Sequence, residues 1–223
     1  MTKNIKLISD KKLIKIPIKD NGEKIVFIKD LIPEIIIKVP KYIECEGNKF
    51  VKQTLMVRIG VAKRLKIAQK LLPQGYKILL RCGYRSIKIQ KEIYQKTYNK
   101  IKCGHPDWSL DKLREETSKF VAPLDIVPPH STGGAVDISI IGNNGKQLDM
   151  GTKIGADMHL EKTMTNSNSV SNIVKMNRKI LIKVMEKAGF VNYPTEWWHW
   201  SFGDRYWAAV LNKKYSIYKS IEL

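Results

Sequence analysis

Two short stretches of the sequence bring together residue types that can do chemistry. The first is His130-Ser131-Thr132-Gly133-Gly134-Ala135-Val136-Asp137, and the second is Glu196-Trp197-Trp198-His199. The Gly-Gly turn in the first stretch allows the chain to fold back, so that the histidine and the aspartate can meet at one point. Neutral imidazole and carboxylate are good zinc ligands, and two histidines with one acid leave a fourth position for water. His130, Asp137 and His199 therefore suggest a catalytic site for one Zn²⁺ per chain.

Two further residues have types that suit such a site. A carboxylate that is not itself a ligand can take a proton from the zinc-bound water and pass it to a leaving amine, and Glu196 suits that role. On a regular strand, residues three apart point to opposite faces, so the segment before His199 must twist, or Glu196 must approach from beside the metal. Arg85, just after a predicted strand end, is a candidate for binding a carbonyl oxygen as it becomes an oxyanion.

Each of these residues also has an ordinary structural interpretation. A single histidine before a strand, an aspartate within a strand, a pair of tryptophans and one arginine are all common in proteins that catalyse nothing. His105 and His159 lie in polar stretches, where we expect them to be solvated. Residue types and spacing alone therefore leave both a metal hydrolase and a protein without catalytic activity open.

Taken together and in order, the motifs resemble those of the zinc D-Ala-D-Ala peptidases, and in particular the D-alanyl-D-alanine dipeptidase family, which includes the vancomycin-resistance dipeptidase. The motifs are Gly83-Tyr84-Arg85, the stretch from Pro129 to Asp137, Leu148-Asp149-Met150-Gly151 and Glu196-Trp197-Trp198-His199. The resemblance implies zinc ligation by His130, Asp137 and His199. It also implies that Glu196 is the catalytic base and acid, and that Arg85 stabilises the transition state. The implied fold is α+β, with a central antiparallel sheet and helices packed around it.

Two positions depart from the pattern of the resistance-type dipeptidases. Pro128-Pro129 stands where those enzymes have a serine shortly before the first zinc histidine. Gly155 stands where they have an aspartate that helps to hold the ammonium group of the substrate, and the nearest acid here is Asp157. Our candidates for substrate binding are Ser131, Tyr84 and Asp157, and the departures leave the choice of dipeptide open.

Hydrophobic periodicity predicts the elements that must position these side chains. They are helices over 53–72, 87–102, 110–119 and 170–188, strands over 76–82, 135–141 and 197–202, and a polar surface loop over 157–169. Ser86 is the expected N-cap of the helix that follows Arg85. The last helix is expected to bury Ile173, Met176, Ile180, Val184 and Ala188. Separate helices and hairpins favour an α+β fold over an alternating α/β fold.

The first 50 residues are interpreted as a strand-rich N-terminal segment of a single domain that spans residues 1–223. Ile14 to Ile18 alternates, Asn21-Gly22 is a turn signal, and Ile25 to Ile28 resumes the apolar run, which predicts a hairpin. A length of 223 residues with 43% hydrophobic residues is enough for one substantial core.

Composition also predicts the setting in which the protein works. The sequence has no run of about 18 or more apolar residues, so no membrane span is expected. It also lacks a recognisable secretory signal at the N-terminus. Three widely spaced cysteines argue against a disulfide framework and favour reduced thiols in the cytoplasm. No feature of the sequence indicates an oligomeric state.

The formal net charge of +19 raises the question of a polyanionic partner. The lysines are spread over most segments rather than clustered, so nucleic-acid binding is not the favoured interpretation. The favoured function is a zinc dipeptidase that acts on D-Ala-D-Ala or a similar small dipeptide. The alternatives are a cell-wall carboxypeptidase or endopeptidase of the same kind, and a zinc-stabilised module that binds a polyanion without catalysis.

Overall fold

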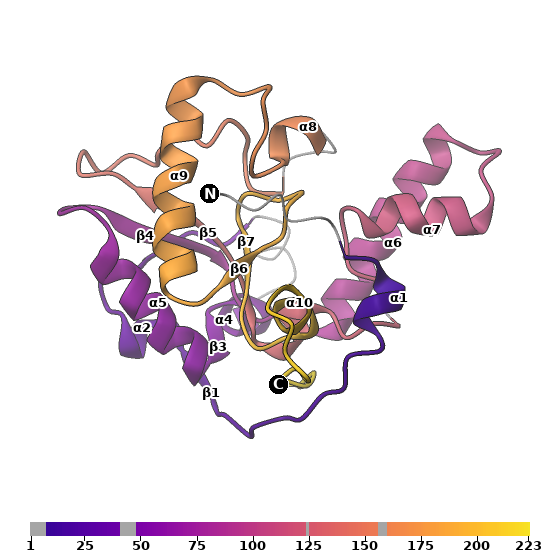
Figure 1. Cartoon of the computed structure of the whole chain (residues 1–223), viewed down its shortest axis with the longest axis horizontal. Helices are drawn as coiled ribbons and strands as arrows, with labels where there is room; N and C mark the ends of the chain where they lie inside the picture. The colour runs from indigo at the N-terminus through magenta and orange to yellow at the C-terminus, as the bar shows by residue number, and fades with distance from the viewer. Residues whose placement is uncertain (1–7, 41–47, 124, 156–159) are drawn as a thin grey trace.

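A mixed sheet lies at the centre of the fold (Figure 1). The computed structural model describes residues 8–40, 48–123, 125–155 and 160–223, and within them the sheet has the strand order β2-β4-β5-β7-β6. Its strands are β2 (Ile36–Ile37), β4 (Lys77–Cys82), β5 (Ala135–Ile141), β6 (Val191–Asn192) and β7 (His199–Ser201). β2 pairs with β4 in parallel, whereas β4–β5, β5–β7 and β7–β6 are antiparallel. The fold is thus α+β, as the sequence predicts.

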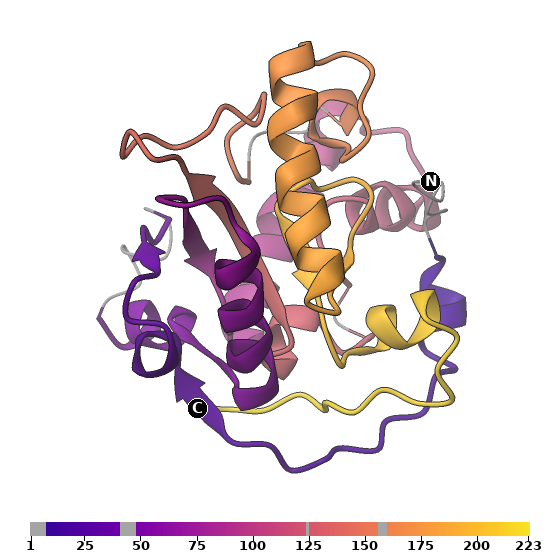
Figure 2. The ribbon, with the colours of Figure 1, turned by 60° about the vertical axis from the view of Figure 1, so that its left-hand side comes forward.

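The central strand β5 separates the core from the face that carries the polar groups. Successive side chains of a strand point to opposite faces. Val136, Ile138 and Ile140 belong to the hydrophobic core, whereas Asp137 and Ser139 lie on the other face and are also buried. The core side of the sheet is covered by α5 (Ile59–Leu71) and α9 (Asn172–Lys187), which contact each other and lie side by side in Figure 2.

The remaining helices frame the other parts of the sheet. α6 (Ile87–Gly104) and α7 (Leu110–Ser118) form a pair that projects from the body of the molecule (Figure 1). As expected, Ser86 caps α6, and its side chain accepts a hydrogen bond from the backbone N–H of Ile89. The shorter helices are α1 (Asp10–Leu13), α2 (Ile28–Leu31), α4 (Asn48–Thr54), α8 (Leu160–Thr163) and α10 (Arg205–Val210). In the part of the chain that the structure describes, no helix is long and apolar enough to cross a membrane.

The predicted N-terminal hairpin is wrong. β1 (Ile25–Phe27) pairs instead with β3 (Met56–Arg58), and Ile18 forms an isolated bridge with Ser216. The described part of the segment 1–50 contains short helices as well as short strands. Strand pairing depends on partners that are distant in the sequence. Apolar alternation on both sides of a turn was therefore not enough to predict which strand pairs with β1.

The predicted helix over 53–72 is correct only from Ile59 onward. Residues 56–58 form β3 because backbone groups of the strand have partners elsewhere: the N–H of Tyr84 donates to Met56 O at 2.8 Å, and the N–H of Arg58 donates to Gly133 O at 3.0 Å. The Arg58 side chain is buried, and it donates to the carbonyls of Thr132, Glu23 and Lys219. These contacts outweigh the helical periodicity of the segment.

Two predictions for the region after residue 156 are also corrected. In α9 the buried face is Val174, Arg178, Leu181, Val184 and Met185, and the exposed fractions of Ile173 and Met176 are 67% and 65%. An arginine lies in the middle of this buried face. A count of apolar residues treats arginine as exposed, so it predicted the wrong side of the helix to be buried. The predicted surface loop over 157–169 contains α8, and its residues Thr163, Thr165 and Ser167 are buried. His159 lies outside the described residues.

Candidate active site

The register of the sheet brings three reactive side chains into one row. Asp137 of β5 lies directly opposite His199 of β7 on one side and opposite Cys82 of β4 on the other. The register shifts between Leu80 and Cys82, which is an irregularity in the β4 strand that places Cys82 beside Asp137. Residues opposite each other on antiparallel strands have their side chains close together. Three segments that are far apart in sequence therefore meet at Asp137.

His130 reaches the same point from a short 3₁₀ helix, η1 (Pro129–Thr132). Its Nδ1 lies 2.7 Å from the carbonyl oxygen of Gly83, and since a carbonyl only accepts, Nδ1 carries the hydrogen. The free lone pair is then on Nε2, which lies 3.3 Å from Asp137 Oδ1. Gly133 ends η1 with a φ of +71°, a left-handed conformation that favours glycine.

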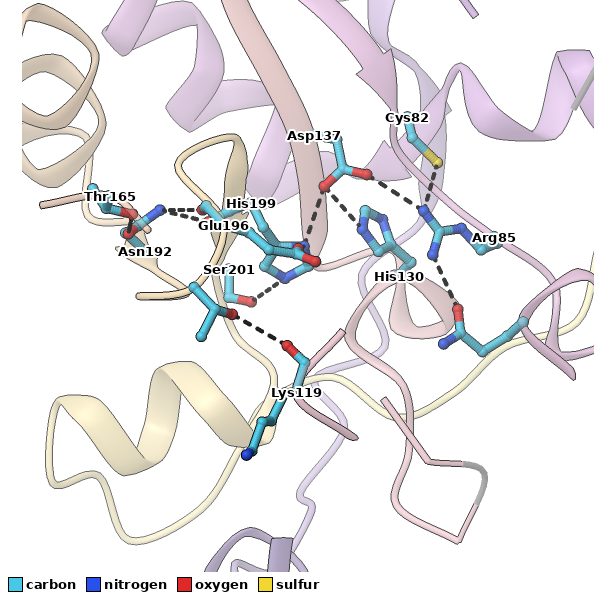
Figure 3. A network of polar contacts seen from close by, with 12 residues as sticks. Cys82, Arg85, Lys119, His130, Asp137, Thr165, Asn192, Glu196, His199 and Ser201 are labelled. Atoms are coloured by element: carbon cyan, nitrogen blue, oxygen red, sulfur yellow. Dashed lines mark hydrogen bonds and ion pairs between the residues drawn. The ribbon is translucent and has the colours of Figure 1, made fainter. Parts of the chain in front are cut away.

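The donor atoms of the two histidines meet at one oxygen of Asp137 (Figure 3). His199 Nδ1 lies 3.2 Å from Asp137 Oδ1, the same oxygen that lies 3.3 Å from His130 Nε2. In a tetrahedral zinc site with bonds of about 2.0–2.1 Å, neighbouring donor atoms lie about 3.3 Å apart. His130, Asp137 and His199 have the donor types of a zinc site, and each histidine nitrogen lies at this spacing from Asp137. The described groups whose donor atoms all lie within 4.8 Å of one another are Cys82-His130-Asp137 and Asp137-Glu196-His199, so Asp137 is common to both.

The electrostatics of this cluster favour a cation. Burial lowers the pKa of His130 to about 4, so that its imidazole is neutral and its lone pair is available. Burial alone would raise the pKa of Asp137, but the neighbouring histidines outweigh it and hold the pKa well below its usual range. For His199, the hydrogen bond and charge of Asp137 outweigh burial and raise the pKa. A positive charge, whether a proton or a metal ion, is thus stabilised between Asp137 and His199.

Glu196 lies beside this cluster on a turn and not on a strand. The turn is closed by two backbone hydrogen bonds, from the Glu196 N–H to Tyr193 O at 3.0 Å and from the His199 N–H to Glu196 O at 3.2 Å. The turn brings the Glu196 carboxylate to the same side as His199, with Oε2 3.9 Å from Nδ1. The constraint that residues three apart oppose each other on a strand therefore does not apply. Burial raises the pKa of Glu196 to about 7, near the value of a general base that works at neutral pH.

Arg85 contacts the other side of Asp137. Its Nη2 lies 3.4 Å from Asp137 Oδ2 and 3.7 Å from Cys82 Sγ, and its Nη1 donates to Gln90 Oε1 at 3.1 Å. The guanidinium is 9% exposed and lines the same cavity as Glu196 and the histidines. Asp137 therefore presents one oxygen to the two histidines and the other to Arg85.

Two of the three candidates for substrate binding, Ser131 and Tyr84, do not line this cavity. Ser131 and Tyr84 are fully buried: the Ser131 hydroxyl donates to Arg85 O at 2.8 Å, and the Tyr84 hydroxyl donates to Ile221 O at 2.9 Å. Both hold the chain around the site rather than contact a bound molecule. Asp157 lies outside the described residues.

Two residues of the site were missed by sequence reasoning. Cys82 places its sulfur within 4.8 Å of donor atoms of both His130 and Asp137, and burial raises the pKa of its thiol to about 11. Gln90 is 2% exposed and bonds Arg85 from the first turns of α6. Cys82, Arg85 and Gln90 are close together in the sequence, and this could have suggested that they share a site. Closeness alone was not enough, because Cys82 lies beside Asp137 only through the register shift in β4.

A cavity of about 410 Å³ opens over these groups. Arg85, His130, Asp137, Glu196 and His199 line it, and it also extends toward α6 and the segment after α7. Concave sites of this size with a few convergent polar groups are typical of small-molecule and peptide binding.

A buried two-histidine, one-carboxylate cluster beside a glutamate of raised pKa, all lining one cavity, has the groups that metal-assisted hydrolysis requires. The chain belongs to the D-Ala-D-Ala dipeptidase family, peptidase family M15, whose model matches residues 24–221.

Individual relatives agree with this assignment. The chain is 27% identical to a D-alanyl-D-alanine dipeptidase of Synechocystis sp. over 95% of this chain and 94% of the relative. It is 26% identical to a D-alanyl-D-alanine dipeptidase of Escherichia coli over 72% of each chain. A solved structure of the LdcB LD-carboxypeptidase matches with 21% identity and a TM-score of 0.45, covering 86% of this chain and 74% of that one.

Proposed function

We propose that the protein is a zinc-dependent dipeptidase that hydrolyses D-Ala-D-Ala or a similar small dipeptide. The observation that carries this proposal is the meeting of His130 Nε2 and His199 Nδ1 at Asp137 Oδ1, with Glu196 Oε2 3.9 Å from His199. The family and the names of the relatives support the choice of a dipeptide. The proposal also includes a single domain over residues 1–223 and a cytoplasmic setting, which the free cysteines Cys82 and Cys103 support.

Each residue of the cluster has a role in the proposed reaction. Zinc bound by His130, Asp137 and His199 would supply a water of lowered pKa and polarise the scissile carbonyl. Glu196 takes a proton from the attacking water and returns it to the leaving amino group, because its raised pKa lets it both accept and donate near neutral pH. Arg85 provides a fixed positive charge for the oxygen that becomes negative in the transition state.

Hydrolysis of D-Ala-D-Ala by the zinc-loaded protein tests the proposal. We expect Glu196→Gln to lower kcat by about 10²–10⁴-fold, the range of a lost general base, while zinc binds with unchanged stoichiometry. Chelation should abolish hydrolysis by the native protein and added zinc should restore it. Glu115→Gln, an exposed glutamate on α7, is the matched control and should leave kcat unchanged. Activity that survives both Glu196→Gln and chelation would refute the proposal.

Substrates of different lengths distinguish the proposed dipeptidase from the alternative peptidase function. A carboxypeptidase or endopeptidase of cell-wall peptides would cleave a peptidoglycan pentapeptide with a higher kcat/KM than free D-Ala-D-Ala. The non-catalytic alternative, a zinc-stabilised polyanion-binding module, predicts nucleic-acid binding that weakens steeply with salt and no hydrolysis of either substrate.

A further inference from the structure

The second ring nitrogen of His199 has a partner of its own. Nδ1 lies 3.2 Å from Asp137 Oδ1, whereas Nε2 lies 3.4 Å from the hydroxyl oxygen of Ser201 (Figure 3). A neutral imidazole carries one hydrogen, so a lone pair on Nδ1 for a metal ion requires that the hydrogen is on Nε2. The hydrogen bond that Nε2 makes therefore decides whether His199 can act as a ligand through Nδ1.

The geometry of β7 places Ser201 beside His199. The two residues are two apart on the strand, so their side chains point to the same face of the sheet. Ser201 is fully buried, and it pairs with Ala135 on one side and with Val191 on the other. A buried hydroxyl that accepts a hydrogen bond from Nε2 needs an acceptor for its own hydrogen.

A tight turn after β7 brings Asp204 back toward Ser201. The turn passes through Gly203, whose φ of +78° is a left-handed conformation that favours glycine. The backbone N–H groups of Ile217 and Tyr218 donate to Gly203 O at 2.8 and 3.1 Å and hold the turn in place. Asp204 is only 1% exposed, so its carboxylate is a buried acceptor next to the strand.

The two oxygens of the Asp204 carboxylate have different surroundings. Oδ1 accepts from the Trp207 N–H at 2.8 Å and so caps α10. Oδ2 is buried and receives no hydrogen bond of good geometry among the described residues. Burial raises the pKa of Asp204, and hydrogen bonds from the Trp207 N–H and the Ser201 hydroxyl lower it in part. The Ser201 hydroxyl is therefore the donor that is available to Oδ2.

We propose that Asp204 and Ser201 are positioning residues that keep the hydrogen of His199 on Nε2 and leave the Nδ1 lone pair free for a metal ion beside Asp137. In this relay the Nε2–H of His199 donates to Ser201 Oγ, and the Ser201 hydroxyl donates to Asp204 Oδ2. The inference rests on the zinc site of the proposed function. It gives Asp204 a role toward the metal in addition to capping α10.

Zinc affinity, measured without substrate by competition with a chromophoric chelator, tests the relay. We expect Ser201→Ala to raise the Kd for zinc by about tenfold or more, as is typical when a residue that orients a metal ligand is lost. Asp204→Asn keeps a good N-cap for α10, but its amide can donate to Ser201 and reverse the relay. The hydrogen of His199 would then be on Nδ1, so this variant should raise Kd at least as much.

Ser139→Ala is the matched control. Like Ser201, Ser139 is fully buried and lies on its strand two residues from a proposed ligand, here Asp137. Its hydroxyl accepts instead from Gln147 Nε2 at 3.1 Å, so the Kd for zinc should not change. The melting temperature of each zinc-free variant is measured alongside, which separates a loss of positioning from a loss of stability.

The double variant Ser201→Ala/Asp204→Asn shows whether Asp204 acts through Ser201. If it does, the Kd for zinc should match that of Ser201→Ala alone, because the relay is already broken. Additive increases in Kd, an unchanged Kd in Ser201→Ala, or an equal increase in Ser139→Ala would overturn the inference.

These outcomes are distinct from those of the proposed function, because none of them depends on hydrolysis. A protein that binds zinc through the relay but cleaves no dipeptide would refute the proposed function and leave the inference standing. A protein that binds no zinc would refute both.

Discussion

At the scale of single residues, Asp137 connects the two halves of the site. Its Oδ1 faces both histidines, and its Oδ2 faces Arg85 at 3.4 Å. A carboxylate held in this way cannot rotate without losing one set of partners. Arg85 therefore does two things at once: it fixes the orientation of the Asp137 carboxylate, a candidate metal ligand, and it places a positive charge in the cavity. Residues that hold a ligand are often as important for a metal site as the ligand itself.

Gln90 is the residue that determines where the Arg85 guanidinium lies. Its Oε1 accepts from Arg85 Nη1 at 3.1 Å, and its Nε2 is bonded to Ala122 O, so that its own rotamer is fixed. We predict that Gln90→Leu lowers kcat for D-Ala-D-Ala by about tenfold or more, because a misplaced guanidinium no longer meets the developing negative charge. KM should change much less than kcat.

A second substitution tests whether Gln90 positions the Arg85 guanidinium or only stabilises the fold. Gln90→Glu keeps the acceptor for Arg85 and should recover most of kcat, although it loses the donor to Ala122. Steady-state kinetics of both variants, with thermal unfolding measured alongside, check the prediction. Equal losses in the two variants, or a loss that follows the melting temperature, would show that Gln90 acts only on stability.

At the scale of elements, α9 shows what the sequence can and cannot predict. Periodicity predicts a helix over 170–188, and the structure has it over Asn172–Lys187, with Ser171 as its N-cap and Gly189, with a φ of +90°, after its end. Its buried face does not follow from periodicity, because Arg178 lies in the middle of that face at 2% exposure. An arginine scores as a surface residue in any count of apolar positions.

The same limit applies to the site. The motifs identified His130, Asp137, His199, Glu196 and Arg85, since their types and order carry information. Cys82 and Gln90 were missed because their roles depend on the register of β4 against β5 and on the rotation of α6. Such information is contained in long-range pairing and not in local spacing.

Arg178 itself holds the chain that borders the cavity. Its guanidinium donates to the carbonyls of Met150, Lys162 and Met164, which lie on both sides of the segment 151–161. Burial lowers its pKa to about 10, which leaves it charged at neutral pH. One side chain thus donates to carbonyls from separate parts of the chain, of which Met164 O also accepts from the Ser167 N–H at 3.1 Å.

We predict that Arg178→Met lowers the free energy of unfolding by about 2–4 kcal/mol, because several backbone carbonyls lose a charged donor together. Chemical denaturation measures this change. Lys175→Met, on the same helix, is the control and should change the free energy by less than about 0.5 kcal/mol. A loss of the same size in both variants would contradict the role of Arg178.

At the scale of the whole molecule, the site lies where separate parts of the chain converge. β4, η1, β5 and β7 each contribute one of its groups, and the C-terminal segment returns to support them: the Ile221 N–H donates to Ser131 O at 3.0 Å. None of these segments can form the site alone. A ligand that binds the converged groups therefore stabilises the entire fold against unfolding.

Removal of the metal should for this reason destabilise the protein. The proposed zinc would bind the folded state and not the dispersed ligands, so at a concentration of 100 times its Kd it should add about 2.7 kcal/mol. For a chain of this size, that free energy corresponds to a rise in Tm of about 5–10 °C. Differential scanning calorimetry after chelation, and again after zinc is restored, measures the difference. Asp137→Asn removes the ligand charge at nearly constant volume and should abolish the zinc-dependent shift. If the variant shows the same shift as the native protein, zinc binds elsewhere and the assignment of His130, Asp137 and His199 as its ligands is wrong.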